Sequence, residues 1–205
     1  MKKIVSFLMF SFLVLISVKG LAQSSKEKVN TLAKQMFVDM NNRDYEAVLA
    51  MTHPKVFEFA SKEQIKTALK IVFEGNSEYS VEISNSIPDF EVSEIFTGDN
   101  NLECGFVVYD LGMKMTFHNQ KFDEATKNMM ITTMKAKEMD VTFTSDNSMN
   151  ISMKNKITAI LKEEATNNEW VMVNYDPYSP LFGKILSPKV LEEVKAYKEK
   201  LLFNK

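Results

Sequence analysis

The chain has very few of the residues that form cross-links or bind metals. It contains one cysteine, Cys104, and two histidines, His53 and His118. A single thiol cannot form a disulfide within the chain. Leu102 and Phe106 share a face of a predicted strand with Cys104, which indicates a buried, unreactive thiol. We therefore expect packing alone to stabilise the fold.

Common catalytic and cofactor motifs are also absent from the sequence. No segment matches a phosphate-binding loop, a dinucleotide fingerprint or the nucleophile elbow of serine hydrolases. No zinc-like or calcium-like ligand spacing occurs. No cluster of basic residues is interleaved with aromatic residues, which argues against nucleic acid as a partner. We therefore expect no cofactor and no bound metal.

The N-terminal segment has the pattern of a secretory signal peptide. Lys2-Lys3 precede an apolar run over residues 4–18, and small residues then lead to a cleavage site after Ala22. The run of about 15 residues is short for a bilayer span of ~20. Cleavage removes three of the 25 basic residues and none of the 27 acidic ones, which leaves a formal charge of −5. The sequence therefore predicts that residues 1–22 are removed and that the product is periplasmic or extracellular, with no attachment to membranes.

The remaining residues, 23–205, are predicted to form a single domain. Their apolar runs are short and interrupted by charge, so no transmembrane segment is expected. No linker rich in Pro, Gly or Ser divides them. Helical spacing of apolar residues predicts a helix over residues 25–41. A second helix follows the cap Asp44, and a third runs from a capping box at Ser61 to a stop at Gly75.

The hydrophobic pattern then changes to the alternation of strands. The phase of this alternation slips near residues 110–112, which predicts a bulge or turn. Apolar residues at alternate positions of the strand over 149–161 are expected to share one face. Helical spacing returns over residues 122–139, and Ser187 caps a final helix. Strands are predicted over residues 81–87, 90–96, 102–118, 141–144, 149–161 and 170–175.

This order of elements predicts an α+β fold. Helices come first and are followed by strands joined as antiparallel hairpins. We expect a curved antiparallel sheet with the N-terminal helices packed on one face, plus an additional internal helix and a C-terminal helix. Such a layout leaves a concavity between sheet and helices, which either holds a ligand or is filled by side chains.

Two segments carry a resemblance to a known group. Residues 42–56 contain Asp44-Tyr45 on an early helix and His53-Pro54 after it, and residues 168–174 place Trp170 in the penultimate strand region. This pattern resembles small exported proteins of Bacteroidetes-like bacteria in the cystatin-like, nuclear transport factor two-like group. The resemblance implies a cone-shaped α+β fold. It implies little about chemistry, because that scaffold is reused for isomerases, dehydratases, binding modules and assembly factors.

The candidate ligand-binding residues are few. The His53 ring can brace its turn, or it can meet Asp44 or Glu58 across a pocket as a base. Trp170 and Tyr175 lie near the end of the last hairpin, where aromatic groups either line a binding mouth or close the core. Our site hypothesis therefore consists of His53, Asp44, Trp170 and Tyr175.

Methionine and paired acids allow further interpretations. Met113 and Met115 near His118 could bind Cu(I), but the methionines fall in phase with Leu, Ile and Phe, which favours core packing. Glu163 and Glu164 are best explained as part of a solvated surface.

We therefore expect a non-enzymatic exported domain that binds a small apolar ligand or a partner protein in the concavity. The alternative is an isomerase- or lyase-like enzyme with His53 or Asp44 as general base. A copper-handling protein is a third possibility.

Overall fold

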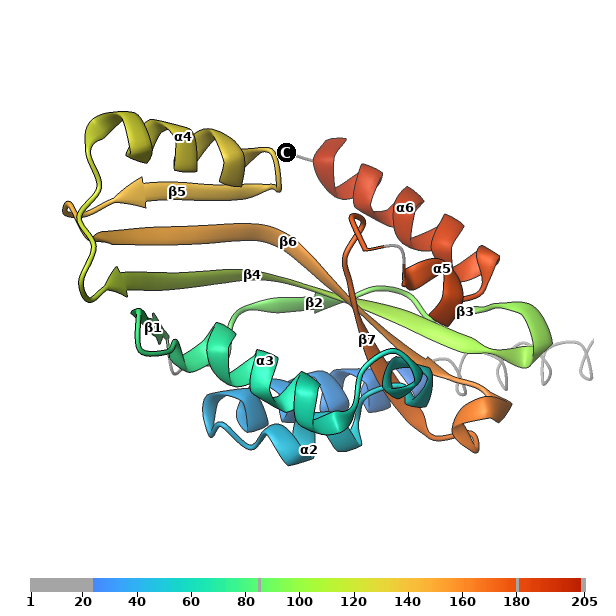
Figure 1. Cartoon of the computed structure of the whole chain (residues 1–205). Coiled ribbons are helices and arrows are strands. Elements are labelled where there is room, and N and C mark those ends of the chain that lie inside the picture. The colour runs from blue at the N-terminus through green and yellow to red at the C-terminus, as the bar shows by residue number, and fades with distance from the viewer. Residues whose placement is uncertain (1–23, 85, 180, 204–205) are drawn as a thin grey trace, which may run out of the picture.

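The computed structural model describes residues 24–84, 86–179 and 181–203 and has an α+β architecture (Figure 1). The predicted signal peptide lies outside these residues. The predicted arrangement of a curved antiparallel sheet with N-terminal, internal and C-terminal helices is confirmed. Within the three described ranges, no helix combines the length and apolar character that a membrane span requires.

The N-terminal helices agree with the sequence prediction within the described residues. The first occupies residues 24–41. Helix α2 (Tyr45–Ala50) is capped by Asp44, whose Oδ1 accepts a hydrogen bond from the Ala47 amide at 3.0 Å. A single 3₁₀ turn, η1 (Pro54–Glu58), leads to α3 (Lys62–Glu74), which opens with the predicted capping box and ends at Gly75. Local capping therefore fixes this part of the fold.

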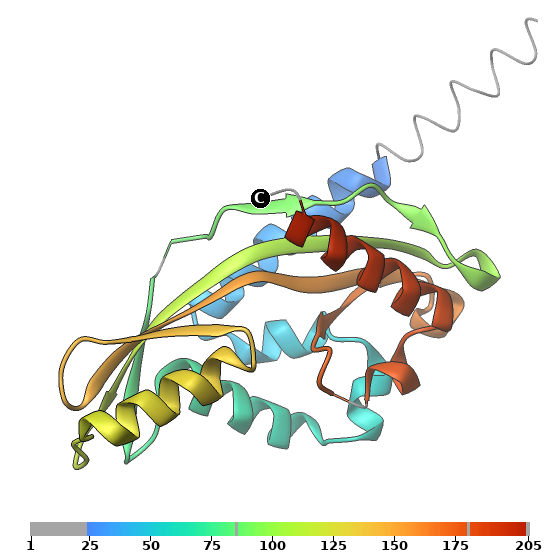
Figure 2. The same cartoon turned by 90° about the horizontal axis from the view of Figure 1, so that it is seen from above.

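Two long antiparallel strands form the centre of the sheet. They are β4 (Glu103–Phe117) and β6 (Ser148–Lys162), of 15 residues each. At one end β1 (Tyr79–Ile83) flanks β4 and β5 (Met139–Phe143) flanks β6. At the other end β2 (Phe90–Val92) and β3 (Phe96–Thr97) flank β4, and β7 (Trp170–Tyr175) flanks β6. The long strands curve through the whole molecule (Figure 2).

A bulge lies between the two ends of the sheet. Tyr109 pairs with Lys156 and Leu111 with Met153, so one residue of β4 stands opposite two of β6. This irregularity confirms the predicted phase slip, although the extra residue belongs to β6. The bulge also turns alternate residues of β6 to the other face, because it interrupts the pleat. The prediction that the apolar residues of 149–161 share one face is therefore wrong.

The predicted strand over residues 90–96 is divided into β2 and β3. Ser93 interrupts the pairing, because its side-chain Oγ accepts the hydrogen bond from the Phe106 amide at 2.9 Å. That amide would otherwise bond to a backbone carbonyl of the neighbouring strand. The helix predicted over 122–139 is present but shorter, as α4 (Glu124–Lys135). A turn over residues 136–138 follows, and Met139 begins β5.

Helices cover both faces of the sheet (Figures 1 and 2). The short α5 (Phe182–Ile185) and the long α6 (Pro188–Phe203) pack on one face of the β7 end, where they enclose the fully buried Cys104. Burial raises the pKa of the Cys104 thiol, in agreement with the predicted unreactive role. The first helix and α2 pack on the opposite face. Helix α4 packs over the β1 and β5 end.

Candidate functional site

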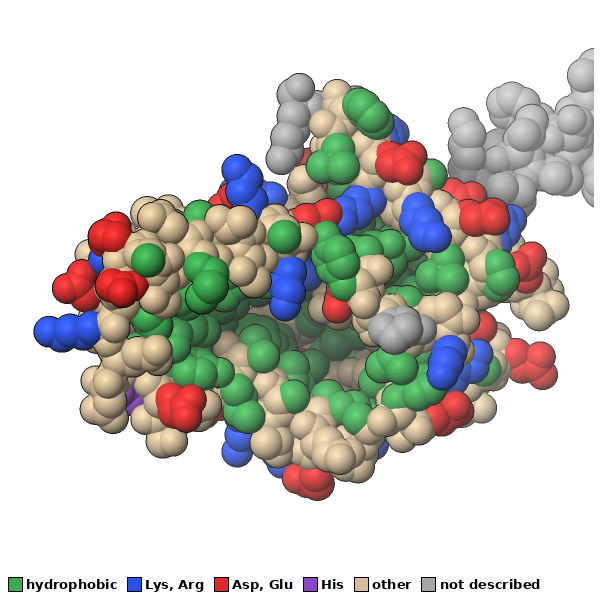
Figure 3. All heavy atoms as spheres, turned by 45° about the horizontal axis from the view of Figure 1, so that its top comes forward, with side chains coloured by type: hydrophobic (Ala, Val, Ile, Leu, Met, Phe, Trp, Pro, Cys, Tyr) green, Lys and Arg blue, Asp and Glu red, His purple; other side chains and the backbone are tan. Residues whose placement is uncertain are grey.

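A cavity of about 500 Å³ separates the sheet from the N-terminal helices. Its mouth is visible as a hollow edged by hydrophobic side chains (Figure 3). A volume of this size lies within the range of ~300–1,000 Å³ that is typical of small-molecule sites. Its apolar lining comes from the first helix, α3, β1, β4, β7 and α5, and includes Met36, Phe37, Ile65, Leu69, Phe73, Ile83, Leu111, Met172 and Phe182.

The cavity exists because the first helix ends before the sheet does. Ile160 and Met172 are paired across β6 and β7, Val107 lies diagonally across from Ile160 on β4, and all three are buried against this helix. The helix ends at residue 41, and Arg43, with φ of 60°, turns the chain away. Beyond this point the same sheet face borders the cavity, although Tyr109 still packs against Phe37 of the first helix, with ring centroids 4.9 Å apart.

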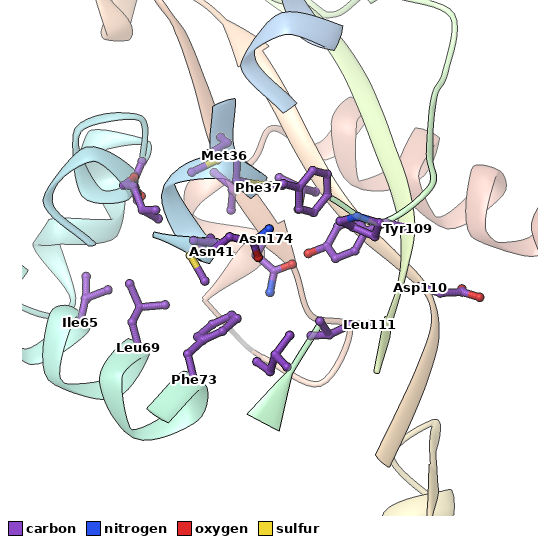
Figure 4. Close-up of a pocket in the computed structure, with 18 of the residues that line it drawn as sticks. Met36, Phe37, Asn41, Ile65, Leu69, Phe73, Tyr109, Asp110, Leu111 and Asn174 are labelled. Atoms are coloured by element: carbon purple, nitrogen blue, oxygen red, sulfur yellow. Dashed lines mark hydrogen bonds between the residues drawn. The ribbon is translucent and has the colours of Figure 1, made fainter. Parts of the chain in front are cut away.

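Helix α3 forms the opposite wall of the cavity. Ile65, Leu69 and Phe73 lie on one face of the helix, four residues apart, and point toward the sheet (Figure 4). None of the residues of α3 is fully buried. A hydrogen bond of 2.8 Å from the Tyr45 hydroxyl to Glu74 ties α3 to α2. The half-exposed stripe follows from facing an open cavity.

Three polar side chains of the sheet line this part of the cavity. Thr158 and Asn174 are paired across β6 and β7, and Tyr109 lies on β4 two residues from Val107, the partner of Thr158. Because alternate residues of a strand share a face, these three side chains project on the same side. Figure 4 shows the Tyr109 hydroxyl and the Asn174 amide pointing into one space. We call Tyr109, Thr158 and Asn174 the polar row.

Burial shapes the chemistry of the polar row. It raises the pKa of the Tyr109 phenol, while a side-chain hydrogen bond with Thr158 acts in the opposite direction. The phenol therefore stays protonated at neutral pH and can donate a hydrogen bond. Thr158 is 2 % exposed, whereas Asn174 is exposed to the cavity and solvent.

The structure places His53 and Asp44 in structural roles outside the cavity lining. His53 is fully buried, with its Nδ1 accepting a hydrogen bond from the Lys55 amide at 3.2 Å and its Nε2 2.9 Å from Glu163 Oε1. The partner of His53 is thus Glu163, which we expected on a solvated surface, rather than Asp44 or Glu58. Asp44 caps α2 from an exposed position.

Trp170 and Tyr175 lie at opposite ends of β7 and on opposite faces of the sheet. Trp170 packs beside the core under the first helix, with Lys162 Nζ 5.8 Å from its ring centroid. Tyr175 is buried against Phe182 in the core under α6, with ring centroids 5.4 Å apart. In the described part of the chain, the structure therefore does not bring the four predicted site residues together, and their role in ligand binding stays a prediction.

The residues that could have bound copper differ in burial. Met113 and Met115 pack in the core under α4. Met129 is 63 % exposed, and His118 is exposed with Nδ1 3.2 Å from the Ser77 carbonyl oxygen. Within the described ranges, no group of three or more His, Cys, Asp or Glu residues could hold a metal ion.

Sequence reasoning missed the polar row. The available signal was a polar residue at a strand position whose neighbours on the same face are apolar, as Thr158 is beside Ile160 and Asn174 beside Met172. Comparison of the chain with protein-family models, curated proteins and solved structures found no match in any of the three. The geometry of the cavity is therefore the basis for the function we propose.

Proposed function

We propose that this chain is an exported domain that holds a small, largely apolar molecule in the cavity between the sheet and the N-terminal helices. The observation that carries the proposal is the open cavity of about 500 Å³ with mainly apolar walls. Burying apolar ligand surface there is favourable by roughly 25 cal/mol per Å². A concave site of this size suits a small molecule better than a protein surface, because large interfaces are flatter and wider.

Binding of a neutral apolar dye tests this proposal. We expect N-phenyl-1-naphthylamine to bind the purified protein saturably, with one dye per chain and increased fluorescence. Leu69→Trp should weaken this binding by about tenfold or more, because Leu69 lines the cavity and a larger side chain there occupies ligand space. Fluorescence titration measures both affinities.

Val72→Trp is the matched control for that substitution. Val72 lies on the same helix, but it is 48 % exposed and does not line the cavity. This variant should bind the dye with the affinity of the parent protein. Dye binding that does not saturate, or that is equal in the Leu69→Trp and parent proteins, would contradict the proposal.

Export is tested separately by the N-terminus of the product. When the full chain is produced in a secreting bacterium, we expect mass spectrometry to find a protein that begins at Gln23, because signal peptidase requires small residues at the cleavage site. Ala22→Tyr should block this cleavage and leave Met1 at the N-terminus. A cytoplasmic product that keeps residues 1–22 in the parent protein would show that the segment is not a signal peptide.

A further inference from the structure

The polar groups on the sheet wall of the cavity are concentrated in one place. Tyr109, Thr158 and Asn174 come from three neighbouring strands and face the same space, opposite the apolar stripe of α3. A purely apolar ligand would displace water from these groups and leave part of their hydrogen-bonding capacity unused, which costs free energy. The arrangement therefore favours a ligand with a polar group at one end of an apolar body.

The hydrogen-bonding capacity of the polar row exceeds its internal use. Each hydroxyl of Tyr109 and Thr158 can donate one hydrogen bond and accept two, so the bond between them leaves capacity for a further partner. No side-chain hydrogen bond joins the Asn174 amide to another residue in the described ranges. That amide can both donate and accept. The row can therefore serve a hydroxyl or a carbonyl oxygen.

Charge around the cavity selects against ions. Among the described residues that line it, none is Lys, Arg or His, and Asp110 is the one acid. The Asp110 carboxylate points away from the cavity (Figure 4) and bonds to Lys154 Nζ at 2.6 Å and to the Asn155 amide at 2.9 Å. A carboxylate ligand would lose its hydration without gaining a cation as partner, which is unfavourable.

We infer that the cavity recognises a neutral molecule with a single hydroxyl or carbonyl group on an apolar body, and that the polar row of Tyr109, Thr158 and Asn174 binds that group. This inference rests on the proposed function and adds the chemical class of the ligand. The polar group lies against the middle of β4, β6 and β7, and the apolar body lies against Ile65, Leu69 and Phe73 of α3.

Three rigid probes of the same size separate these contributions. They are 2-naphthol, naphthalene and 2-naphthoate, which at pH 7 carry a neutral hydroxyl, no polar group and a negative charge. We expect equilibrium dialysis to show that 2-naphthol binds about fivefold to tenfold more tightly than naphthalene, which corresponds to one neutral hydrogen bond. 2-Naphthoate should bind at least about tenfold more weakly than 2-naphthol, because its charge has no partner.

Substitutions test whether the polar row causes the preference for 2-naphthol over naphthalene. Tyr109→Phe should reduce the advantage of 2-naphthol over naphthalene to less than about twofold without weakening naphthalene binding, because the unpaired hydroxyl is gone. Asn174→Leu tests the row at an exposed position, where the fold tolerates substitution, and should also reduce this advantage. Tyr197→Phe is the control, because Tyr197 packs against the core on the other face of the sheet. It should keep the full preference.

The outcomes distinguish the inference from the proposed function. Equal binding of 2-naphthol and naphthalene would overturn the inference and leave cavity binding intact. A preference that survives both Tyr109→Phe and Asn174→Leu, or tight binding of 2-naphthoate, would overturn it as well. Failure of all three probes to bind would overturn the proposed function together with the inference.

Discussion

Gly75→Ala should destabilise the protein by about 3 kcal/mol, which lowers the melting temperature by roughly 10 °C for a domain of this size. Gly75 ends α3 with φ of 88° and ψ of −158°, a conformation that is almost confined to glycine. A Cβ atom there would lie 2.1 Å from the Tyr79 carbonyl oxygen. That oxygen accepts a hydrogen bond from the Asn76 amide, so the turn between α3 and β1 must open to relieve the clash. Thermal and urea unfolding followed by circular dichroism measure the effect.

Gly183→Ala provides the control for the loss of a glycine. A Cβ at Gly183 meets no atom within 4 Å, and its φ is not positive. This substitution should change the free energy of unfolding by less than about 1 kcal/mol and can be stabilising, because Gly183 lies in a helix. A Gly75→Ala protein as stable as the Gly183→Ala protein would show that the turn relaxes freely. Because α3 is a wall of the cavity, the destabilised variant should also bind the dye more weakly.

Local elements were predictable because their determinants are close in the sequence. The caps at Asp44 and Ser61 and the stop at Gly75 each involve residues within four positions of one another. Their physics is a competition between backbone and nearby side-chain hydrogen bonds, which the sequence displays directly. The same holds for Ser187, whose Oγ accepts from the Val190 amide at the start of α6.

The layout of the sheet was predictable only in outline. The phase slip near Asp110 indicated a bulge, but which strand holds the extra residue depends on the pairing of β4 with β6. Ser93 shows the same limit. Its hydroxyl interrupts an edge strand by bonding to the Phe106 amide, 13 residues away. Such tertiary contacts override the local alternation that predicted one continuous strand.

The site could not be predicted from the local sequence pattern, because it depends on where the first helix ends relative to the sheet. Asn174, the exposed member of the polar row, borders the cavity beyond the point where the first helix stops at residue 41, while β4 and β6 continue. The end of the first helix is not unusual in itself, and neither are the residues of the polar row. Their combination requires the crossing of helix and sheet, which places Asn41 and Asn174 on the same cavity. Sequence reasoning instead selected His53, a residue type with catalytic potential.

His53→Ala should destabilise the protein by about 3 kcal/mol. The ring is fully buried and links the Lys55 amide, at the start of η1, to the carboxylate of Glu163, the residue after β6. Because Nδ1 accepts from an amide, we assign the ring proton to Nε2, which donates to Glu163. Removing the ring leaves a void and takes away the hydrogen bonds that it makes with the Lys55 amide and the Glu163 carboxylate. Urea unfolding measures the loss, and His118→Ala, at an exposed position, should cost less than about 0.5 kcal/mol.

Variants of Glu163 and measurements of dye binding distinguish a structural role for His53 from a role in ligand binding. Glu163→Gln keeps an acceptor for Nε2 and should cost only about 1 kcal/mol, the difference between a charge-assisted and a neutral hydrogen bond. In a Glu163→Ala background, His53→Ala should cost less than it does in the parent protein, because the two side chains interact directly. At a temperature where the His53→Ala protein is folded, its dye affinity should equal that of the parent, since His53 does not line the cavity. A loss of dye binding by the fully folded His53→Ala protein would instead indicate that His53 takes part in ligand binding.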